Sequence, residues 1–148
     1  MSVIFLMFLL TLESLKGPVP QAPRVVLVAE DEVVVRNIVC FLLNHEGYQV
    51  LSAADGAEAL ALAREYQGTI DLLLTDITMP RMNGVVLAAQ MISERPGIRV
   101  LLMSGKISSE IREKNIHLPF LRKPFVPGAF RDKVRDVLNG PPAQPQEF

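Results

Sequence analysis

The chain has 148 residues, and 49% of them are apolar, which suits one domain with a buried core. Fifteen Lys and Arg against sixteen Asp and Glu give a formal charge of -1, so the chain lacks the strongly basic field that selects nucleic-acid backbones, and we expect no direct nucleic-acid binding. The single cysteine, Cys40, excludes an internal disulfide and a cysteine-based metal cluster. We expect it to be a small core residue in a reducing, cytoplasmic compartment.

Residues 1–23 read as an apolar N-terminal extension followed by a Pro-rich linker. The N-terminal run that includes Val3 to Leu12 would make a helix of about 18 Å if it covers twelve residues, short of the roughly 30 Å of a bilayer core, so we expect no membrane span. A signal peptide is poorly supported, because no Lys or Arg precedes the run and prolines crowd the segment after it. An accessory helix, a self-association surface giving a homodimer, and a membrane-directed segment remain as alternatives.

From Arg24 to Asn139, short apolar runs alternate with amphipathic stretches, a pattern typical of an α/β domain. We predict a doubly wound, flavodoxin-like fold, with a five-stranded parallel sheet in the order 2-1-3-4-5 flanked by five helices. The predicted strands cover residues 24–29, 48–53, 71–76, 98–103 and 119–122. The predicted helices cover residues 32–46, 56–66, 84–94, 108–114 and 127–139. Residues 140–148 read as a Pro/Gln-rich tail, either disordered or the start of a linker.

Apolar periodicity predicts which helix faces pack on the sheet. In the helix over 32–46 the predicted packing face carries Val34, Ile38, Phe41 and Leu42. In the last helix it carries Phe130, Val134, Val137 and Leu138.

Polar side chains follow four of the predicted strands. Asp76 ends the third strand and precedes a turn-rich segment, Glu30 and Asp31 follow the first strand, Ser104 follows the fourth and Lys123 follows the fifth. Parallel strands bring their carboxyl ends to one rim of the sheet, where α/β proteins place their sites. Clustered carboxylates repel one another unless a cation neutralises them, and an acidic all-oxygen site suits Mg²⁺. With the ion present, Asp76 can attack an activated phosphoryl group, while Lys123 stabilises the charge on the transferred oxygens.

These residues stand in motifs that resemble those of two-component response-regulator receiver domains, the superfamily of the chemotaxis response regulators. The motifs are VAEDE around Glu30, LLTDITMPRMNG around Asp76, LLMSG ending just after Ser104, and FLRKPF around Lys123. The resemblance covers about residues 24–139. It implies that Asp76 accepts a phosphoryl group from a sensor histidine kinase or a histidine phosphotransfer protein, and that Lys123 contacts this group.

The resemblance also implies the remaining roles. Glu30, Asp31, Asp76 and the backbone carbonyl of Thr78 would hold Mg²⁺, and Ser104 with Phe120 would form a conformational switch. The chain would then be a phosphoprotein of phosphorelay signal transduction that catalyses only its own phosphorylation and dephosphorylation. Its downstream protein partner is not named by the sequence.

The sequence departs from the commonest receiver pattern. Glu30 stands where the first acid is more often Asp, Ser104 stands where Thr is frequent, and Phe120 stands where Tyr is frequent. The interval from Ser104 to Lys123 is short, so we expect a brief helix there. Lys106, near the expected phosphoryl position, could influence hydrolysis together with Thr78.

Two other classes of function compete with the phosphoacceptor. A degenerate receiver would serve only as a protein-docking module, although the intact acids and Lys123 argue against it. A phosphatase of the haloacid dehalogenase type would also use a strand-end Asp nucleophile, but it needs an acid or base two residues later, where Thr78 stands. A flavodoxin-like nucleotide binder is disfavoured, because Glu30 and Asp31 would repel phosphate.

Overall fold

The computed structural model describes residues 2–14, 21–105 and 116–145. It contains one parallel sheet in the order β2-β1-β3-β4-β5, as predicted. The elements are α1 (Val3–Ser14), β1 (Val25–Ala29), α2 (Val33–His45), β2 (Gln49–Ala53), α3 (Gly56–Glu65), β3 (Leu72–Asp76), α4 (Gly84–Glu94), β4 (Arg99–Ser104), β5 (Phe120–Arg122) and α6 (Pro127–Asn139). Each observed strand lies within one residue of its predicted bounds. The expected helix over 108–114 and Lys106 lie outside the described residues.

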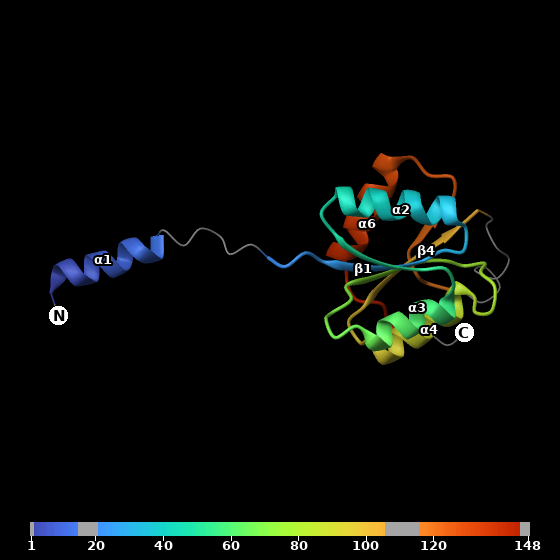
Figure 1. Ribbon diagram of the computed structural model, residues 1–148, viewed down its shortest axis with the longest axis horizontal. Coiled ribbons are helices and arrows are strands. Elements are labelled where there is room, and N and C mark those ends of the chain that lie inside the picture. The colour runs from blue at the N-terminus through green and yellow to red at the C-terminus, as the bar shows by residue number, and fades with distance from the viewer. Residues whose placement is uncertain (1, 15–20, 106–115, 146–148) are drawn as a thin grey trace.

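The sheet is covered on both faces, with α2 and α6 on one side and α3 and α4 on the other (Figure 1). Strands β1 and β3 are fully buried because each lies between two neighbours and under helices on both sides. Such strands read as continuous apolar runs, which is why the sequence reveals them. The register pairs Ala29 with Thr75 and Asp76 with Met103, so the strands end at the same level of the sheet.

The helix boundaries follow local chemistry. The Asp55 side chain accepts a hydrogen bond from the Glu58 amide at 2.9 Å and so caps α3, and Asn83 caps α4 in the same way. Gly47 follows α2 with a φ of 89°, a backbone conformation that glycine adopts without a steric penalty. These caps explain why the predicted helix ends lie close to the observed ones.

The predicted packing face of α6 is confirmed, and that of α2 is largely wrong. All four predicted residues of α6 are buried. In α2, by contrast, Val34, Ile38 and Phe41 are 71%, 50% and 69% exposed, and the buried residues are Val39 and Leu43. Most of α2 is apolar, so two faces satisfy a helical period, and the sheet takes the one that the pattern did not select.

The Pro-rich segment after α6 is attached to the domain at its start. The Ala143 amide donates to the Ile98 carbonyl at 2.9 Å, and the Arg99 Nε donates to the Gly140 carbonyl at 2.9 Å. Residues 140–143 of the predicted disordered tail therefore lie against the start of β4.

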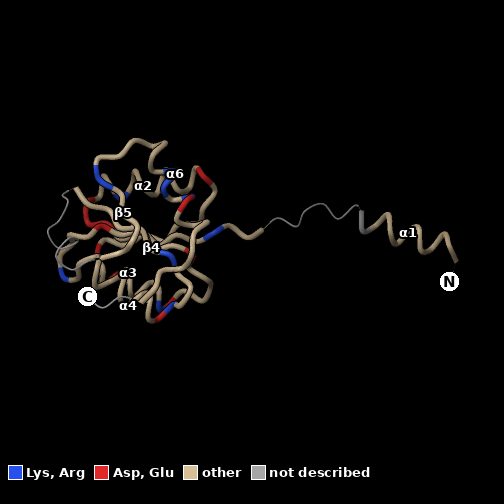
Figure 2. Tube along the Cα trace, turned by 180° about the vertical axis from the view of Figure 1, so that it is seen from behind, with Lys and Arg blue, Asp and Glu red and all other residues tan. Residues whose placement is uncertain are grey.

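Helix α1 stands apart from the sheet (Figure 1). Among the described residues, no helix is both long and apolar enough to cross a membrane. In the domain, Lys and Arg are scattered among Asp and Glu over the trace (Figure 2). This mixture agrees with the near-neutral net charge of -1.

Candidate functional site

The predicted site residues come from strands that end side by side. The Ile77 amide donates to the Met103 carbonyl at 3.0 Å and ties the end of β3 to β4. The Lys123 amide donates to the Ser104 carbonyl at 2.9 Å and ties the segment after β5 to the end of β4. These backbone bonds fix the level at which each side chain leaves the sheet.

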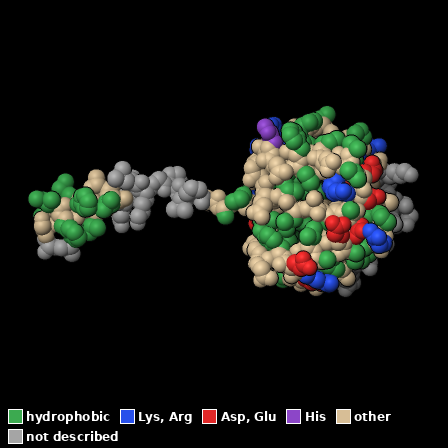
Figure 3. All heavy atoms as spheres, viewed as in Figure 1, with side chains coloured by type: hydrophobic (Ala, Val, Ile, Leu, Met, Phe, Trp, Pro, Cys, Tyr) green, Lys and Arg blue, Asp and Glu red, His purple; other side chains and the backbone are tan. Residues whose placement is uncertain are grey.

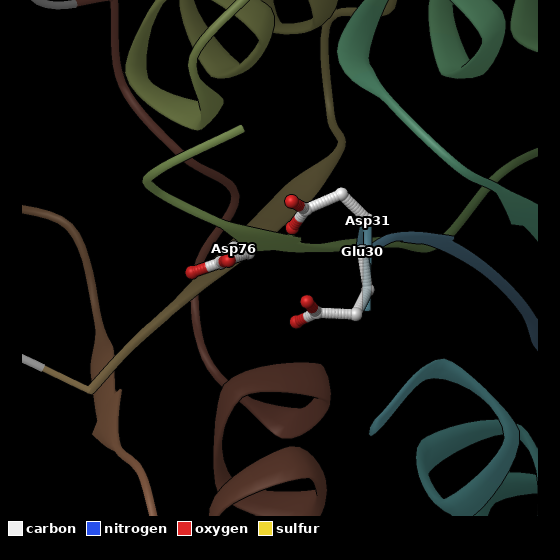
Figure 4. A group of neighbouring side chains, drawn as sticks. All are labelled: Glu30, Asp31 and Asp76. Carbon is white, nitrogen blue, oxygen red and sulfur yellow. The ribbon is translucent and has the colours of Figure 1, made fainter. Parts of the chain in front are cut away.

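Three carboxylates converge at this rim. Glu30, Asp31 and Asp76 each offer one oxygen atom, and these oxygens lie within 4.8 Å of one another. Figure 4 shows the three side chains directed toward a common space. Glu30 is fully buried and Asp76 is only 6% exposed, whereas Asp31 is open to solvent. Three oxygens at this spacing could hold a small divalent cation reached from the solvent side.

Lys123 supplies the positive charge. Its Nζ lies 2.6 Å from Glu30 Oε2 and 3.5 Å from Asp76 Oδ2. Burial opposes the charge of the lysine, but the hydrogen bond to Glu30 and the negative charge of Asp76 outweigh it and raise the pKa of Lys123. The ammonium group is therefore retained at the rim, closer to Glu30 than to Asp76.

Burial and neighbouring negative charge raise the pKa of both buried acids. Burial raises the pKa of Glu30, with a further rise from Asp76, and the bond from Lys123 only partly offsets this. Burial also raises the pKa of Asp76, and Asp31 adds to the rise while Lys123 opposes it. One lysine thus does not neutralise this group of acids, which is the condition that favours a bound cation.

Glu30 is positioned by contacts that sequence reasoning missed. Its Oε1 accepts a hydrogen bond from the Glu32 amide at 3.2 Å, and its backbone carbonyl accepts one from Arg36 Nη1 at 2.8 Å. Arg36 lies one turn into α2, and no motif marks it in the sequence. The first bond orients the Glu30 carboxylate, and the second holds the backbone from which that side chain leaves the sheet.

The turn after β3 requires a glycine where the chain has Gly84. The Gly84 amide donates to the Ile77 carbonyl at 2.8 Å, and a Cβ on Gly84 would lie 2.0 Å from the Asp76 carbonyl oxygen. Thr75 Oγ1 also donates to that oxygen at 2.8 Å. The backbone of Asp76 is therefore fixed from two sides, and no side chain fits at position 84 without moving it.

A second ion pair closes the same turn. Arg81 has a φ of 68°, and its guanidinium pairs with the buried carboxylate of Asp55. The hydrogen bond from the Glu58 amide, and then the one from Arg81, lower the pKa of Asp55. The sequence carries no signal for this pairing, since Arg81 and Asp55 are 26 positions apart.

The predicted switch pair lies on one side of the rim. Ser104 is 3% exposed, and Phe120 is partly buried against the core beneath α3 and α4. Phe120 pairs in register with Leu102, two residues before Ser104. Thr78 is exposed, and the role of its carbonyl stays a prediction. The Lys123–Pro124 peptide bond is cis.

Comparison with known proteins identifies this arrangement. The family model described as the response regulator receiver domain matches residues 26–135. The aerobic respiration control protein ArcA of Escherichia coli is 30% identical over 122 residues, covering 80% of this chain and 50% of ArcA. The transcriptional regulatory protein PdtaR of Mycobacterium tuberculosis is 34% identical over 116 residues, covering 74% of this chain and 56% of PdtaR. The chain thus spans about half the length of these relatives.

Solved structures agree with this match. The chemotaxis response regulator CheY4 of Vibrio cholerae superposes with a TM-score of 0.69 at 30% identity, covering 78% of this chain and 99% of CheY4. The predicted fold and the predicted family are both confirmed. The chain belongs to the response regulator receiver domain family.

Proposed function

We propose that Asp76 accepts a phosphoryl group from a sensor histidine kinase or a histidine phosphotransfer protein and that the phosphorylated chain signals by a conformational change. The observation that carries this proposal is the position of Asp76: a strand-end carboxylate 3.5 Å from Lys123 and beside two further acids. Family membership supports it, because receiver domains act with such phosphodonors.

The reaction forms one bond and breaks one. A carboxylate oxygen of Asp76 attacks the phosphorus of a phosphohistidine, the new P–O bond gives an acyl phosphate, and the P–N bond breaks. The departing imidazole nitrogen keeps the electron pair and takes up a proton from solvent. Lys123, whose raised pKa keeps it charged, stabilises the transferred oxygens.

The residues present fit Mg²⁺ as the cofactor. The donor set of Glu30, Asp31 and Asp76 is entirely oxygen and carries more negative charge than Lys123 balances, as a hard divalent cation requires. We assign the backbone carbonyl of Thr78 as a fourth protein ligand on the strength of the resemblance. Bound Mg²⁺ supplies charge neutralisation for the incoming phosphoryl group.

The environment of Asp76 suits a reversible nucleophile. Burial raises its pKa, which makes the carboxylate more basic than an exposed one, and Lys123 opposes this rise. The donor therefore supplies the phosphoryl group, and the chain catalyses its transfer to its own Asp76. We propose no activity on other substrates.

Phosphorylation changes the charge at one rim of the sheet. The acyl phosphate adds about one negative charge and new acceptor oxygens, which draw the Ser104 hydroxyl toward Asp76. Movement of Ser104 leaves space for Phe120, which is only partly buried and follows it inward. We propose that the surface around β4 and β5 then meets a downstream protein, in the cytoplasm.

The test is the intact mass of the chain after incubation with acetyl phosphate, with and without Mg²⁺. We expect a gain of one phosphate that requires Mg²⁺ and is absent from D76N but present in D136N, a matched change at an exposed acid of α6. A gain that survives in D76N would refute the assignment of Asp76. No gain under any condition would favour the docking-only module.

A further inference from the structure

The side chains that the structure describes in helix α1, those of residues 3–12, form no polar side to turn toward water. These side chains are apolar apart from Thr11, and all of them are exposed, from 42% at Leu9 to 80% at Ile4. The Thr11 hydroxyl donates to the Met7 carbonyl, so even this group is satisfied within the helix. Figure 3 shows hydrophobic side chains along the described surface of α1. A helix that is apolar all round requires burial on several sides.

A lipid bilayer does not supply this burial well. Twelve residues make a helix of about 18 Å, against the roughly 30 Å of a hydrocarbon core. A helix lying in the membrane surface needs a polar face with basic residues, and α1 contains no Lys or Arg. The surface that covers α1 is therefore better sought on a protein.

The chain itself presents a matching surface on α2. Val34, Ile38 and Phe41 stand at positions i, i+4 and i+7 and are 71%, 50% and 69% exposed; we call these three residues the α2 stripe. The stripe bears no charge, and α2 has 13 residues against the 12 of α1, so the two helices can lie along each other over their full lengths. Two helices that pack through side chains of this kind lie about 8–10 Å apart, measured between their axes.

The connection between the two surfaces is long enough. Ten residues, 15–24, separate α1 from β1 and span at most about 35 Å when extended. Helix α2 packs on the sheet that contains β1, and it is itself about 20 Å long. The linker can therefore bring α1 to the α2 stripe of the same chain. One stripe covers only one side of α1, however, and the opposite side still requires an apolar neighbour.

We propose that two copies of this chain associate through α1, with each α1 lying between the α2 stripe of its own chain and the α1 of the other copy. The four helices then form a bundle around an apolar seam, and every apolar side of α1 gains a partner. The proposal does not depend on phosphorylation, because both surfaces are exposed without it.

The first test is the mass of the unphosphorylated full chain, by light scattering coupled to gel filtration. We expect twice the monomer mass of 16.4 kDa for the wild type and 16.4 kDa for L6E/L10E, which places two charges on one side of α1. The control V86E changes an apolar residue of α4 that is 44% exposed and should remain a dimer. Equal urea midpoints for the variants would show that the domain remains folded. A monomeric wild type, or a dimeric L6E/L10E, would overturn the proposal.

The second test concerns the α2 stripe. We expect F41E to weaken the dimer at least about tenfold in Kd, as loss of one well-buried aromatic anchor does. With Cys40→Ser as background, Leu6→Cys alone should give a disulfide-linked dimer on a non-reducing gel, because this side of α1 faces the α1 of the other copy. A Leu6→Cys chain that stays monomeric on oxidation would overturn the second copy as partner. Flotation of a monomeric chain with vesicles of phosphatidylcholine and phosphatidylglycerol would overturn it in favour of lipid.

Discussion

Replacing Asp76 by Asn should stabilise the chain when no metal ion is present. At an effective dielectric of about 20, the Lys123 charge at 3.5 Å attracts Asp76 by about 5 kcal/mol, and each of two carboxylates within 4.8 Å repels it by at least about 3.5 kcal/mol. The exposed Asp31 is screened and counts for less, while burial of Asp76 adds a penalty that Asn lacks. We therefore expect D76N to raise the free energy of unfolding by about 1–2 kcal/mol at pH 7 in EDTA.

The stability difference between D76N and the wild type should depend on pH. Because the pKa of Asp76 in the folded chain lies above its usual value of 3.8, the carboxyl is protonated in both folded and unfolded chains at lower pH, and the variants should match there. As the pH rises through the raised folded pKa, the wild type loses stability and D76N does not. The gain should thus grow with pH and then level off.

Urea unfolding of wild type, D76N and the control D136N, in EDTA and in Mg²⁺, measures these differences. Mg²⁺ should stabilise the wild type more than D76N, which lacks one carboxylate ligand. A D76N chain that is less stable than the wild type in EDTA, or a difference that does not change with pH, would refute the electrostatic reasoning. D136N should follow the wild type throughout.

Three further changes test the supports of the site. G84A should lower the free energy of unfolding by about 1–3 kcal/mol and abolish phosphorylation, because its Cβ would lie 2.0 Å from the carbonyl oxygen of Asp76. The control G128A, which has open space around its Cβ, should still be phosphorylated. K123M should lose about 3 kcal/mol at neutral pH by leaving the buried Glu30 unpaired. Only the wild type should then lose this contribution as the pH rises above 10.5 through the raised folded pKa of Lys123, which a urea series at pH 9–12 would show. D55A should lose about 1 kcal/mol in urea unfolding and D55N much less, since Asn also caps a helix.

The sequence was most informative where a strand is buried on both faces. Continuous apolar runs locate β1 and β3, and the polar residue that ends each run is then placed at the rim by the parallel topology. Asp76 and Glu30 could therefore be predicted as neighbours, although they are far apart in sequence. The same reasoning could not predict that Glu30 is the closer partner of Lys123, because that depends on side-chain length and on the bond that orients the Glu30 carboxylate.

Helix α2 shows where pattern reasoning fails. One face of this helix carries Val34 and Phe41, and another carries Val39 and Leu43. Both pairs of residues recur with a helical period. Hydrophobicity alone cannot decide which set meets the sheet. The exposed set is still informative, because an uncovered apolar stripe of this kind usually has a partner.

The side-chain charges of the site do not balance, and the imbalance differs between its two buried acids. Glu30 is one methylene longer than the Asp that is commoner in its position, and it lies 2.6 Å from Lys123, whereas Asp76 lies 3.5 Å from the same nitrogen. Since the lysine satisfies Glu30 first, Asp76 keeps more of its unfavourable charge. A residue in that state gains most from an incoming cation, because the cation relieves repulsion that the folded chain otherwise retains. The instability predicted for Asp76 and the tendency of the site to bind a cation thus have one physical origin.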